Sequence, residues 1–139
     1  MKVMRSAFLG LGLLLAVSAA QAQEPRVKAN IPFDFVVGDR AMPAGEYLVT
    51  PGGASAAISI SSLDRADTAL VIAHACGSSG PSRDTKLVFH ALAGRYFLSQ
   101  VWTAGYSQGR EIRMSKTEVQ LAKNGTEQKE FVLAANAKK

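Results

Sequence analysis

Three side chains in this sequence have the chemistry to bind a transition metal: His74, Cys76 and His90. His74 and Cys76 are two positions apart, so in a β-strand both side chains would point to the same face. Imidazole nitrogen and thiolate sulfur are ligands for zinc and copper, and His90 from a neighbouring strand could supply the third. The alternative is a packed Cys76 and histidines that hydrogen-bond to the backbone. We name these residues as metal candidates and expect no resident cofactor.

A second possible chemistry is the stacking of aromatic rings on a sugar. Residues 86–103 are the most aromatic-rich part of the chain, and Tyr96 and Trp102 are the candidate binding residues if one face of their strand is exposed. The alternative, which we favour, places these aromatic side chains in the hydrophobic core, because each ring then contributes a large buried area.

No motif in the chain predicts an enzyme. The sequence contains no Gly-x-Ser-x-Gly turn to expose a nucleophilic serine, and nothing near Cys76 would lower the pKa of its thiol. Asp34 and Glu46 are the acids embedded in a motif, and we expect Asp34 on the solvent face of its strand. No glycine-rich loop opens a helix after a strand, which disfavours nucleotide binding.

The elements that would position these side chains are β-strands, because apolar and polar residues alternate with a period of two. A long strand is expected over 27–37, with Pro32 at an edge or a bulge because proline cannot donate to a ladder. The run over 68–75 is almost entirely apolar and predicts a buried strand, followed by an exposed loop over 77–84. Further strands are expected over 47–50, 57–61, 86–92, 95–103 and 128–134.

One short helix is expected near the C-terminus. Ser115 and Glu118 have the spacing of a capping box, and Asn124-Gly125 would end the helix or form a hairpin turn. Residues 135–139 are expected to fray. The fold class that follows is all-β: a single-domain antiparallel sandwich or flattened barrel of about seven or eight strands with one short helix.

Two blocks of the sequence resemble a family of small exported proteins found mainly in acidobacteria. The first begins at Val27 and contains Ile31-Pro32-Phe33-Asp34-Phe35 followed by Pro43-Ala44-Gly45-Glu46-Tyr47. The second contains Lys86-Leu87-Val88-Phe89-His90 and the run from Arg95 to Trp102. The resemblance extends over roughly residues 27–109. It implies an exported β domain and carries over no catalytic or ligand residues.

Residues 1–22 have the pattern of a secretory signal peptide. Lys2 and Arg5 precede an apolar run over 7–17, and Ala20-Gln21-Ala22 has the small-x-small pattern of a cleavage site. We expect cleavage after Ala22 and one exported domain over 23–139. The apolar run is shorter than the ~20 residues of a membrane span, and no later run is long enough. No cysteine lies at the cleavage site, so no lipid anchor is expected, and a periplasmic or extracellular location follows.

The composition narrows the range of partners. The single cysteine, Cys76, cannot form an internal disulfide, so packing must stabilise the domain. The whole chain has a formal charge of +5, which falls to +3 without Lys2 and Arg5, and the excess lies in residues 110–139. The basic residues are not grouped with exposed aromatics, which disfavours nucleic acid. The oligomeric state is left open.

Three functional hypotheses remain, in order of preference. The first is a non-enzymatic module that binds a protein or glycan of the cell envelope. The second is a carrier that holds a small molecule in the sandwich interior, or a metal at His74, Cys76 and His90. The third is a hydrolase whose active site has no recognisable motif.

Overall fold

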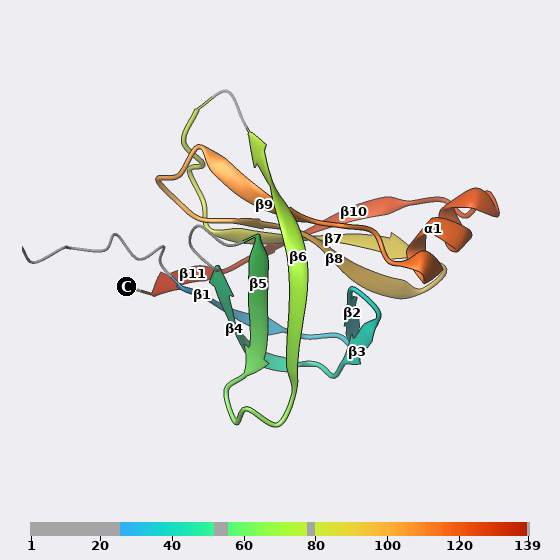
Figure 1. The fold of residues 1–139 in the computed structure, drawn as a ribbon, viewed down its shortest axis with the longest axis horizontal. Helices are drawn as coiled ribbons and strands as arrows, with labels where there is room; N and C mark the ends of the chain where they lie inside the picture. Colours follow the sequence, from blue (N-terminus) through green and yellow to red (C-terminus); the bar gives the residue numbers. More distant parts are fainter. Residues whose placement is uncertain (1–25, 52–55, 78–79, 139) are drawn as a thin grey trace, which may run out of the picture.

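The computed structural model describes residues 26–51, 56–77 and 80–138, arranged as Figure 1 shows. The predicted signal peptide at residues 1–22 lies outside this part of the chain. The described residues are mostly β, with eleven strands and one short helix. In chain order the elements are β1 (Arg26–Ile31), β2 (Phe35–Val37), β3 (Arg40–Met42), β4 (Gly45–Pro51), β5 (Ala57–Ser62), β6 (Thr68–Gly77), β7 (Lys86–Leu92), β8 (Arg95–Trp102), β9 (Gln108–Ile112), α1 (Lys116–Lys123), β10 (Lys129–Ala134) and β11 (Asn136–Lys138).

The strands form one large mixed sheet that is not closed. Its order is β10-β7-β8-β9-β6-β5-β4-β1-β11, with β2 attached to β8 and β3 attached to β2. Every pair of neighbours is antiparallel except β2 and β8, which run parallel. The end strands β10 and β11 follow one another in the chain but do not pair together. The prediction of seven or eight strands was wrong, because the strand predicted over 27–37 is divided in two and three further strands, β3, β9 and β11, are present.

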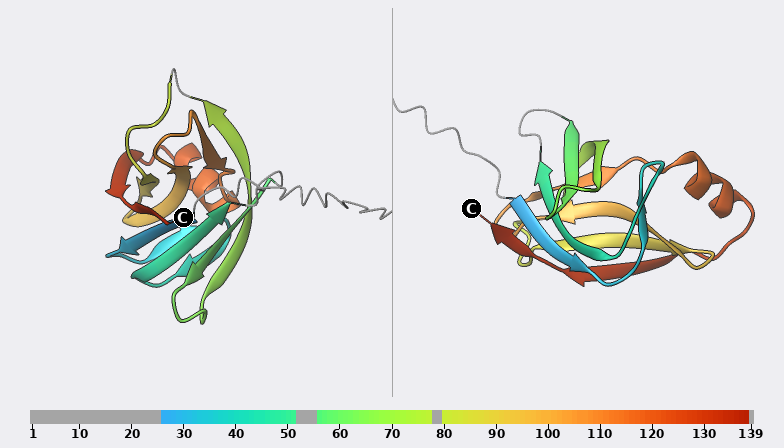
Figure 2. Two further views of the ribbon diagram at one scale, coloured as in Figure 1. Left: turned by 90° about the vertical axis from the view of Figure 1, so that its left-hand side faces the viewer. Right: turned by 90° about the horizontal axis from the view of Figure 1, so that it is seen from below.

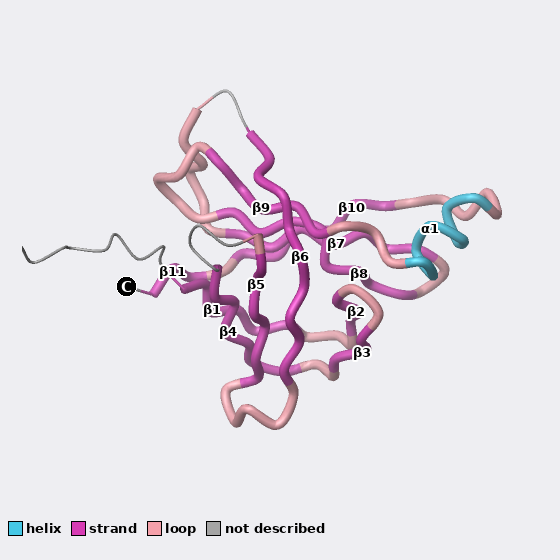
Figure 3. The backbone as a smooth tube through the Cα atoms, viewed as in Figure 1, coloured by secondary structure: helices cyan, strands magenta, loops and turns pink. Residues whose placement is uncertain are grey.

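The sheet bends so that its two halves face each other across the core. Half A consists of β1, β4, β5, β11 and the first part of β6, and half B consists of β2, β3, β7 to β10 and the last part of β6. Figures 1 and 2 show β4 and β5 of half A crossing β7 and β8 of half B at a steep angle. The long strand β6 runs without a break through both halves, as the backbone in Figure 3 shows.

The core lies between the two halves, and both contribute apolar side chains to it. This is the expected result of alternation, because every second residue of a strand points inward. The buried core residues are Val27, Ala29, Ile31, Phe35, Val37, Met42, Tyr47, Val49, Ile58, Ile60, Ala69, Ala73, Leu87, Phe89, Leu98, Val101 and Ile112.

The predicted strand over 27–37 is interrupted, so its prediction as one continuous strand was wrong. β1 ends at Ile31, and Pro32 to Asp34 carry the chain from half A to half B, where β2 begins. Proline has no N–H to continue the ladder. The exposed Asp34 accepts a hydrogen bond from the Ala44 N–H (2.9 Å) through its carboxylate, which holds this crossing against the residues before β4.

The hairpin predicted around Ala93-Gly94 is confirmed. Its two turn residues have φ angles of +51° and +75°, the positive values that a two-residue type I′ turn requires. A bulge interrupts the β7–β8 ladder where Val88 pairs with Gln100 and Phe89 with Leu98. Ser99 is the extra residue on β8.

Helix α1 confirms the predicted cap and covers the outer face of half B. The Glu118 N–H donates to the Ser115 hydroxyl (3.1 Å), and the helix ends at the cap residue Asn124. The helix packs against β7. Three apolar residues of half B are buried outside the main core, beside this helix: Val88, Leu92 and Phe97.

Besides the short β3, which pairs only with β2, two strands were not expected from the sequence. β9 carries Arg110 and Glu111 among its five residues, so its apolar pattern is weak. β11 lies where we expected fraying, and that prediction was wrong, because Asn136, Ala137 and Lys138 pair with β1. Figure 2 shows β1 and β11 side by side at this edge. Both strands are specified by their distant partners.

Candidate binding groove

The structure does not bring the three candidate metal ligands together. His74 and Cys76 lie on β6 and His90 lies on β7, with β8 and β9 between the two strands. Three strand spacings amount to about 14 Å. Within the described ranges, no group of three or more His, Cys, Asp or Glu side chains is suitably placed to hold a metal ion.

His90 has a structural partner on the helix. Its Nδ1 atom lies 2.9 Å from Oε1 of Glu118, and both side chains are largely buried under α1. Glu118 therefore has two roles, because its backbone N–H binds the cap residue Ser115 while its carboxylate contacts β7. This pair fixes the helix on half B, a contact that the capping-box spacing alone does not predict.

Cys76 is half-buried and lacks the features of an activated nucleophile. Burial raises the pKa of its thiol, and the nearby Glu111 carboxylate raises it further. A raised pKa keeps the thiol protonated at neutral pH, and the thiolate is the form that attacks or binds metal. The position of Cys76 therefore favours the packed alternative.

The two candidate stacking residues lie in different surroundings. Tyr96 is half-buried and stacks on Phe33 with ring centroids 4.0 Å apart. Trp102 lies on the outer face of half B, so the expectation that it is a core residue was wrong. Its indole N–H donates to Gln100 (2.9 Å) through the amide oxygen, and Lys86 lies 6.0 Å from the ring centroid. A Cβ at Gly109 would approach the ring to 2.7 Å, so the indole packs closely on that strand.

The predicted exposed loop over 77–84 is described except for residues 78 and 79. Ser82 ties it to the connection between β8 and β9 through two backbone bonds: its N–H donates to Tyr106 (2.9 Å) and its carbonyl accepts from Gly105 (2.9 Å). This half of the loop is therefore anchored.

The first block of the family resemblance, residues 27–47, is called the head motif here, and its acids are structural or solvent-facing. Asp34 is exposed as expected and holds the Ala44 N–H, and Glu46 is exposed on β4. Tyr47, in the same motif, is buried and donates its hydroxyl proton to the Pro43 carbonyl (2.6 Å). These contacts join the two parts of the head motif, and they give Asp34 and Tyr47 a structural role.

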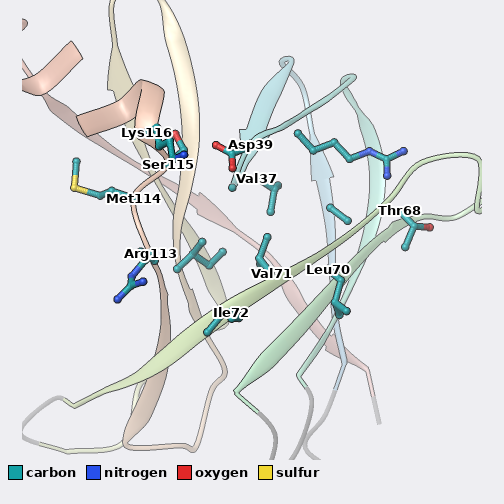
Figure 4. Close-up of a pocket in the computed structure, with 14 residues that line it drawn as sticks. Val37, Asp39, Thr68, Leu70, Val71, Ile72, Arg113, Met114, Ser115 and Lys116 are labelled. Carbon is teal, nitrogen blue, oxygen red and sulfur yellow. The ribbon is translucent and has the colours of Figure 1, made fainter. Parts of the chain in front are cut away.

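The feature with the geometry of a binding site is a groove beside β6, which we call the β6 groove. It forms where β6 passes from half A to half B and has a volume of about 620 Å³. Figure 4 shows its walls: β6 on one side, the β2–β3 turn on another, and the segment between β9 and α1 on the third. Its lining residues are Val37 to Arg40, Thr68 to Ile72 and Ile112 to Lys116.

Two backbone hydrogen bonds establish which residues of β6 direct their N–H and C=O groups toward β5 and which direct them away from it. The Ser62 N–H donates to the Asp67 carbonyl (2.8 Å), and the Ala73 N–H donates to the Ala56 carbonyl (2.7 Å). They lie at the two ends of the β5–β6 ladder. Because hydrogen-bonded pairs alternate along antiparallel strands, the odd-numbered residues of β6 direct their backbone groups toward β5.

The even-numbered residues of the first part of β6 therefore face the groove. These are Thr68, Leu70 and Ile72, and β9 pairs with β6 only from Ala73 onward. Within the described residues, no strand pairs with this edge. The β6 groove thus contains a row of backbone N–H and C=O groups in position to accept another strand.

Leu70 and Ile72 also expose their side chains, which are 72% and 64% accessible. The prediction of a buried strand over 68–75 was wrong, because only Ala69 and Ala73 are buried there. Val71 is half-buried, and the other residues of the run are exposed: Thr68, Leu70, Ile72, His74 and Ala75. Thr68 is the one polar residue on the outer face of this part of β6, so its pattern is close to that of a strand buried on both faces. Sequence reasoning had no signal by which to find this site.

The rim of the groove is basic. Arg40, Arg113 and Lys116 are exposed on its borders, against one acidic side chain, Asp39. Among the described residues these three cations make no ion pair. The one buried hydroxyl of the lining, that of Ser115, already accepts the helix-cap bond. The arrangement offers backbone bonding, apolar contact and positive charge.

Comparisons with protein-family models, with curated proteins and with solved structures find no match to this chain. None of the described helices is long and apolar enough to cross a membrane.

Proposed function

We propose that this chain is an exported, non-enzymatic β-sandwich module that binds a protein of the cell envelope through the β6 groove. The observation that carries the proposal is the unpaired edge of β6 beside the exposed side chains of Leu70 and Ile72. Contiguous exposed apolar side chains are typical of interaction sites. An edge of this kind is otherwise a liability that proteins cover or charge.

Export is supported by the sequence pattern of residues 1–22, with cleavage expected after Ala22. The resemblance to small exported proteins supports the same conclusion. We expect the mature module in the periplasm or outside the cell, where the binding partner would be an envelope component.

The test is the melting temperature of the purified protein with a panel of extended peptides, cell-wall fragments and polysaccharides. A ligand that binds the native state must stabilise it, by roughly 2.7 kcal/mol at 100 times its Kd. The matched variants are Leu70→Glu in the groove and Val132→Glu, which changes another exposed apolar residue on β10. A peptide-induced shift that Leu70→Glu abolishes and Val132→Glu retains supports the proposal. A shift that survives Leu70→Glu contradicts it.

A second candidate function, glycan binding, is favoured by one observation. Trp102 is half-exposed on the outer face of half B, and Gln100 and Lys86 lie beside its ring. An indole with polar neighbours suits the apolar face of a sugar and its hydroxyl groups. A polysaccharide-induced shift that Trp102→Ala removes and Leu70→Glu retains would make this candidate the function.

The metal-carrier and hydrolase hypotheses receive less support. His90 is engaged with Glu118 and is remote from His74 and Cys76. Zinc or copper that raises the melting temperature, with the shift lost in His74→Ala, would restore the carrier hypothesis. Turnover of any panel member would restore the hydrolase.

A further inference from the structure

We infer that the β6 groove takes an extended polypeptide segment as an added β-strand, and that this segment carries acidic side chains beside apolar ones. The inference deepens the proposed function and depends on it. It specifies how the partner binds and which chemistry the partner must have.

The backbone geometry supports strand addition. Thr68, Leu70 and Ile72 direct their N–H and C=O groups to the groove, and these positions alternate as in a ladder. A strand placed there would satisfy this row of groups in the same way as β5 satisfies the opposite edge of β6. Strand addition of this kind derives its affinity from main-chain hydrogen bonds and its specificity from alternate side chains.

The side chains on both faces of such a strand would meet apolar surface. On the outer face, its residues would lie beside Leu70 and Ile72. On the inner face, they would lie toward Val37, Val71 and Ile112, which line the groove. The β2–β3 turn approaches β6 at the Val71 side chain, since a Cβ at Gly38 would lie 3.1 Å from Cγ1 of Val71. A partner strand with β-branched or small apolar residues would match both faces.

The positive charge of the rim indicates which charge the partner segment carries. Arg40 lies on the β2–β3 side of the groove, and Arg113 and Lys116 lie on the side of β9 and α1. A strand running along β6 would pass between these cations. Carboxylates on the segment would meet unpaired guanidinium and ammonium groups, and such charge-assisted hydrogen bonds are stronger than neutral ones. An acidic segment is therefore favoured over a basic one.

A second copy of this chain is a poorer occupant. Two copies of β6 could pair about Leu70, because the segment from Thr68 to Ile72 has no charged residue. That pairing would bring the basic rims of both copies toward each other, and the single acid of each rim, Asp39, is outnumbered by its three cations. Like charges placed across an interface disfavour the complex.

The experiment measures binding of synthetic peptides to the purified protein by fluorescence anisotropy. The main probe is a short peptide with alternating valine and threonine residues between paired glutamates. One control replaces the glutamates with lysines. A second control keeps the sequence but carries N-methyl groups on all of its central residues, which removes the backbone donors from both edges and leaves the side chains in place.

Two pairs of variants test the protein side. Leu70→Pro removes the edge N–H and the side chain, whereas Leu70→Ala removes the side chain alone. Proline is tolerated at an edge whose N–H is outside the ladder, and the melting temperature checks that the fold is kept. Arg40→Glu and Arg113→Glu, each made singly, reverse the charge of the rim, and Lys129→Glu on β10 is the matched charge control.

Strand addition predicts that the acidic peptide binds at least about tenfold more tightly than either control. The lysine peptide loses at least one charge-assisted hydrogen bond, and the N-methyl peptide loses several backbone hydrogen bonds of about 1 kcal/mol each. Leu70→Pro must weaken binding more than Leu70→Ala, and the reversed rim must weaken it more than Lys129→Glu. Equal affinity for the N-methyl peptide overturns strand addition while leaving a groove-binding protein. If no peptide binds, or if the protein forms a dimer that Leu70→Pro abolishes, the inference of an acidic partner segment is overturned. The proposed function itself fails if the peptide-induced shift in melting temperature survives Leu70→Glu.

Discussion

Two of the places where the chain passes from one half of the sheet to the other are completed differently. One is the step from β10 to β11, beside the crossing from β1 to β2. The other is β6, which pairs with β5 in half A and β9 in half B. At the first, aromatic side chains fill the space between diverging strands. At the second, the space is the β6 groove.

The filled region, which we call the aromatic seam, is built around Phe33. Its ring stacks on Tyr96 at 4.0 Å and meets the edges of Phe89 at 5.1 Å and Phe131 at 5.5 Å, measured between ring centroids. These rings come from the β1–β2 crossing, β8, β7 and β10. Such ring contacts stabilise the fold beyond what the burial of the rings contributes.

The aromatic seam is expected to serve stability, and the β6 groove is expected to serve binding. In the aromatic seam, side chains from four segments pack against one another, so the region is expected to contribute to the free energy of unfolding. In the β6 groove, backbone groups and apolar side chains are left without partners inside the described chain. This difference predicts that substitutions in the two regions have opposite consequences.

The largest expected effect is in the aromatic seam. Phe33→Ala removes the ring that contacts Phe89, Tyr96 and Phe131, and is expected to lower the free energy of unfolding by about 3 kcal/mol. Urea denaturation followed by circular dichroism measures the change. Phe131→Ala should cost less, because Phe131 is 40% exposed. A loss below about 1 kcal/mol for Phe33→Ala would contradict the assignment of the seam to folding.

A smaller effect is expected at the border of the β6 groove. Gly38 has φ of +58°, and a Cβ there would lie 3.1 Å from Cγ1 of Val71. Gly38→Ala therefore combines backbone strain with a tight contact, and should destabilise by about 1–2 kcal/mol. Gly94→Ala is the matched control, since Gly94 has φ of +75° and nothing within 4 Å of a Cβ. Equal losses would show that the contact between the turn and β6 contributes nothing.

The stability of the protein should also depend on pH through Tyr47, which contacts Phe35 next to the aromatic seam. Burial raises the pKa of Tyr47, with Asp67 adding to the effect, and its ring packs on Phe35 at 5.0 Å. Above about pH 10, tyrosine ionises in the unfolded chain while Tyr47 stays neutral in the fold. Stability should therefore fall as the pH rises through and beyond 10.

Tyr47→Phe tests this titration by removing the ionisable group. The variant should lose about 1 kcal/mol at neutral pH with its hydrogen bond to Pro43, and its stability should decline less steeply above pH 10. The measurement is the free energy of unfolding across pH 8 to 11 for both proteins. Parallel curves would refute a shifted pKa at Tyr47.

The smallest effect on stability is expected inside the β6 groove. Leu70→Glu should change the free energy of unfolding by less than about 0.5 kcal/mol, because the side chain is 72% exposed. The same variant should abolish binding of the acidic peptide. A large loss of stability would show that Leu70 belongs to the folded core and would remove the contrast between the two regions.

Much of the local structure was predictable from residues that act over short distances. The hairpin at Ala93-Gly94 and the helix cap at Ser115 follow from turn and capping chemistry, and both were confirmed. The strands β9 and β11 were missed because their polar residues give no clear period. They exist because distant strands supply their partners.

The candidate site was hidden from the sequence for a related reason. Leu70 and Ile72 lie in an apolar run that has the same pattern whether one face or both faces are covered. His90 likewise suggested a ligand, and its neighbour proved to be Glu118, 28 positions away. Which surfaces face each other depends on contacts between residues far apart in the chain.

The sequence by itself determined the β class, the turns, the helix cap and the pattern of a signal peptide, because these depend on neighbouring residues and on backbone sterics. Only the tertiary structure decided that β6 would leave half of one edge unpaired and that Trp102 would lie outside the core. A strand's free edge depends on where its neighbours end, and β9 stops pairing with β6 at Ile112, which lies opposite Ala73. That termination, set by the packing of two halves of a sheet, creates the β6 groove.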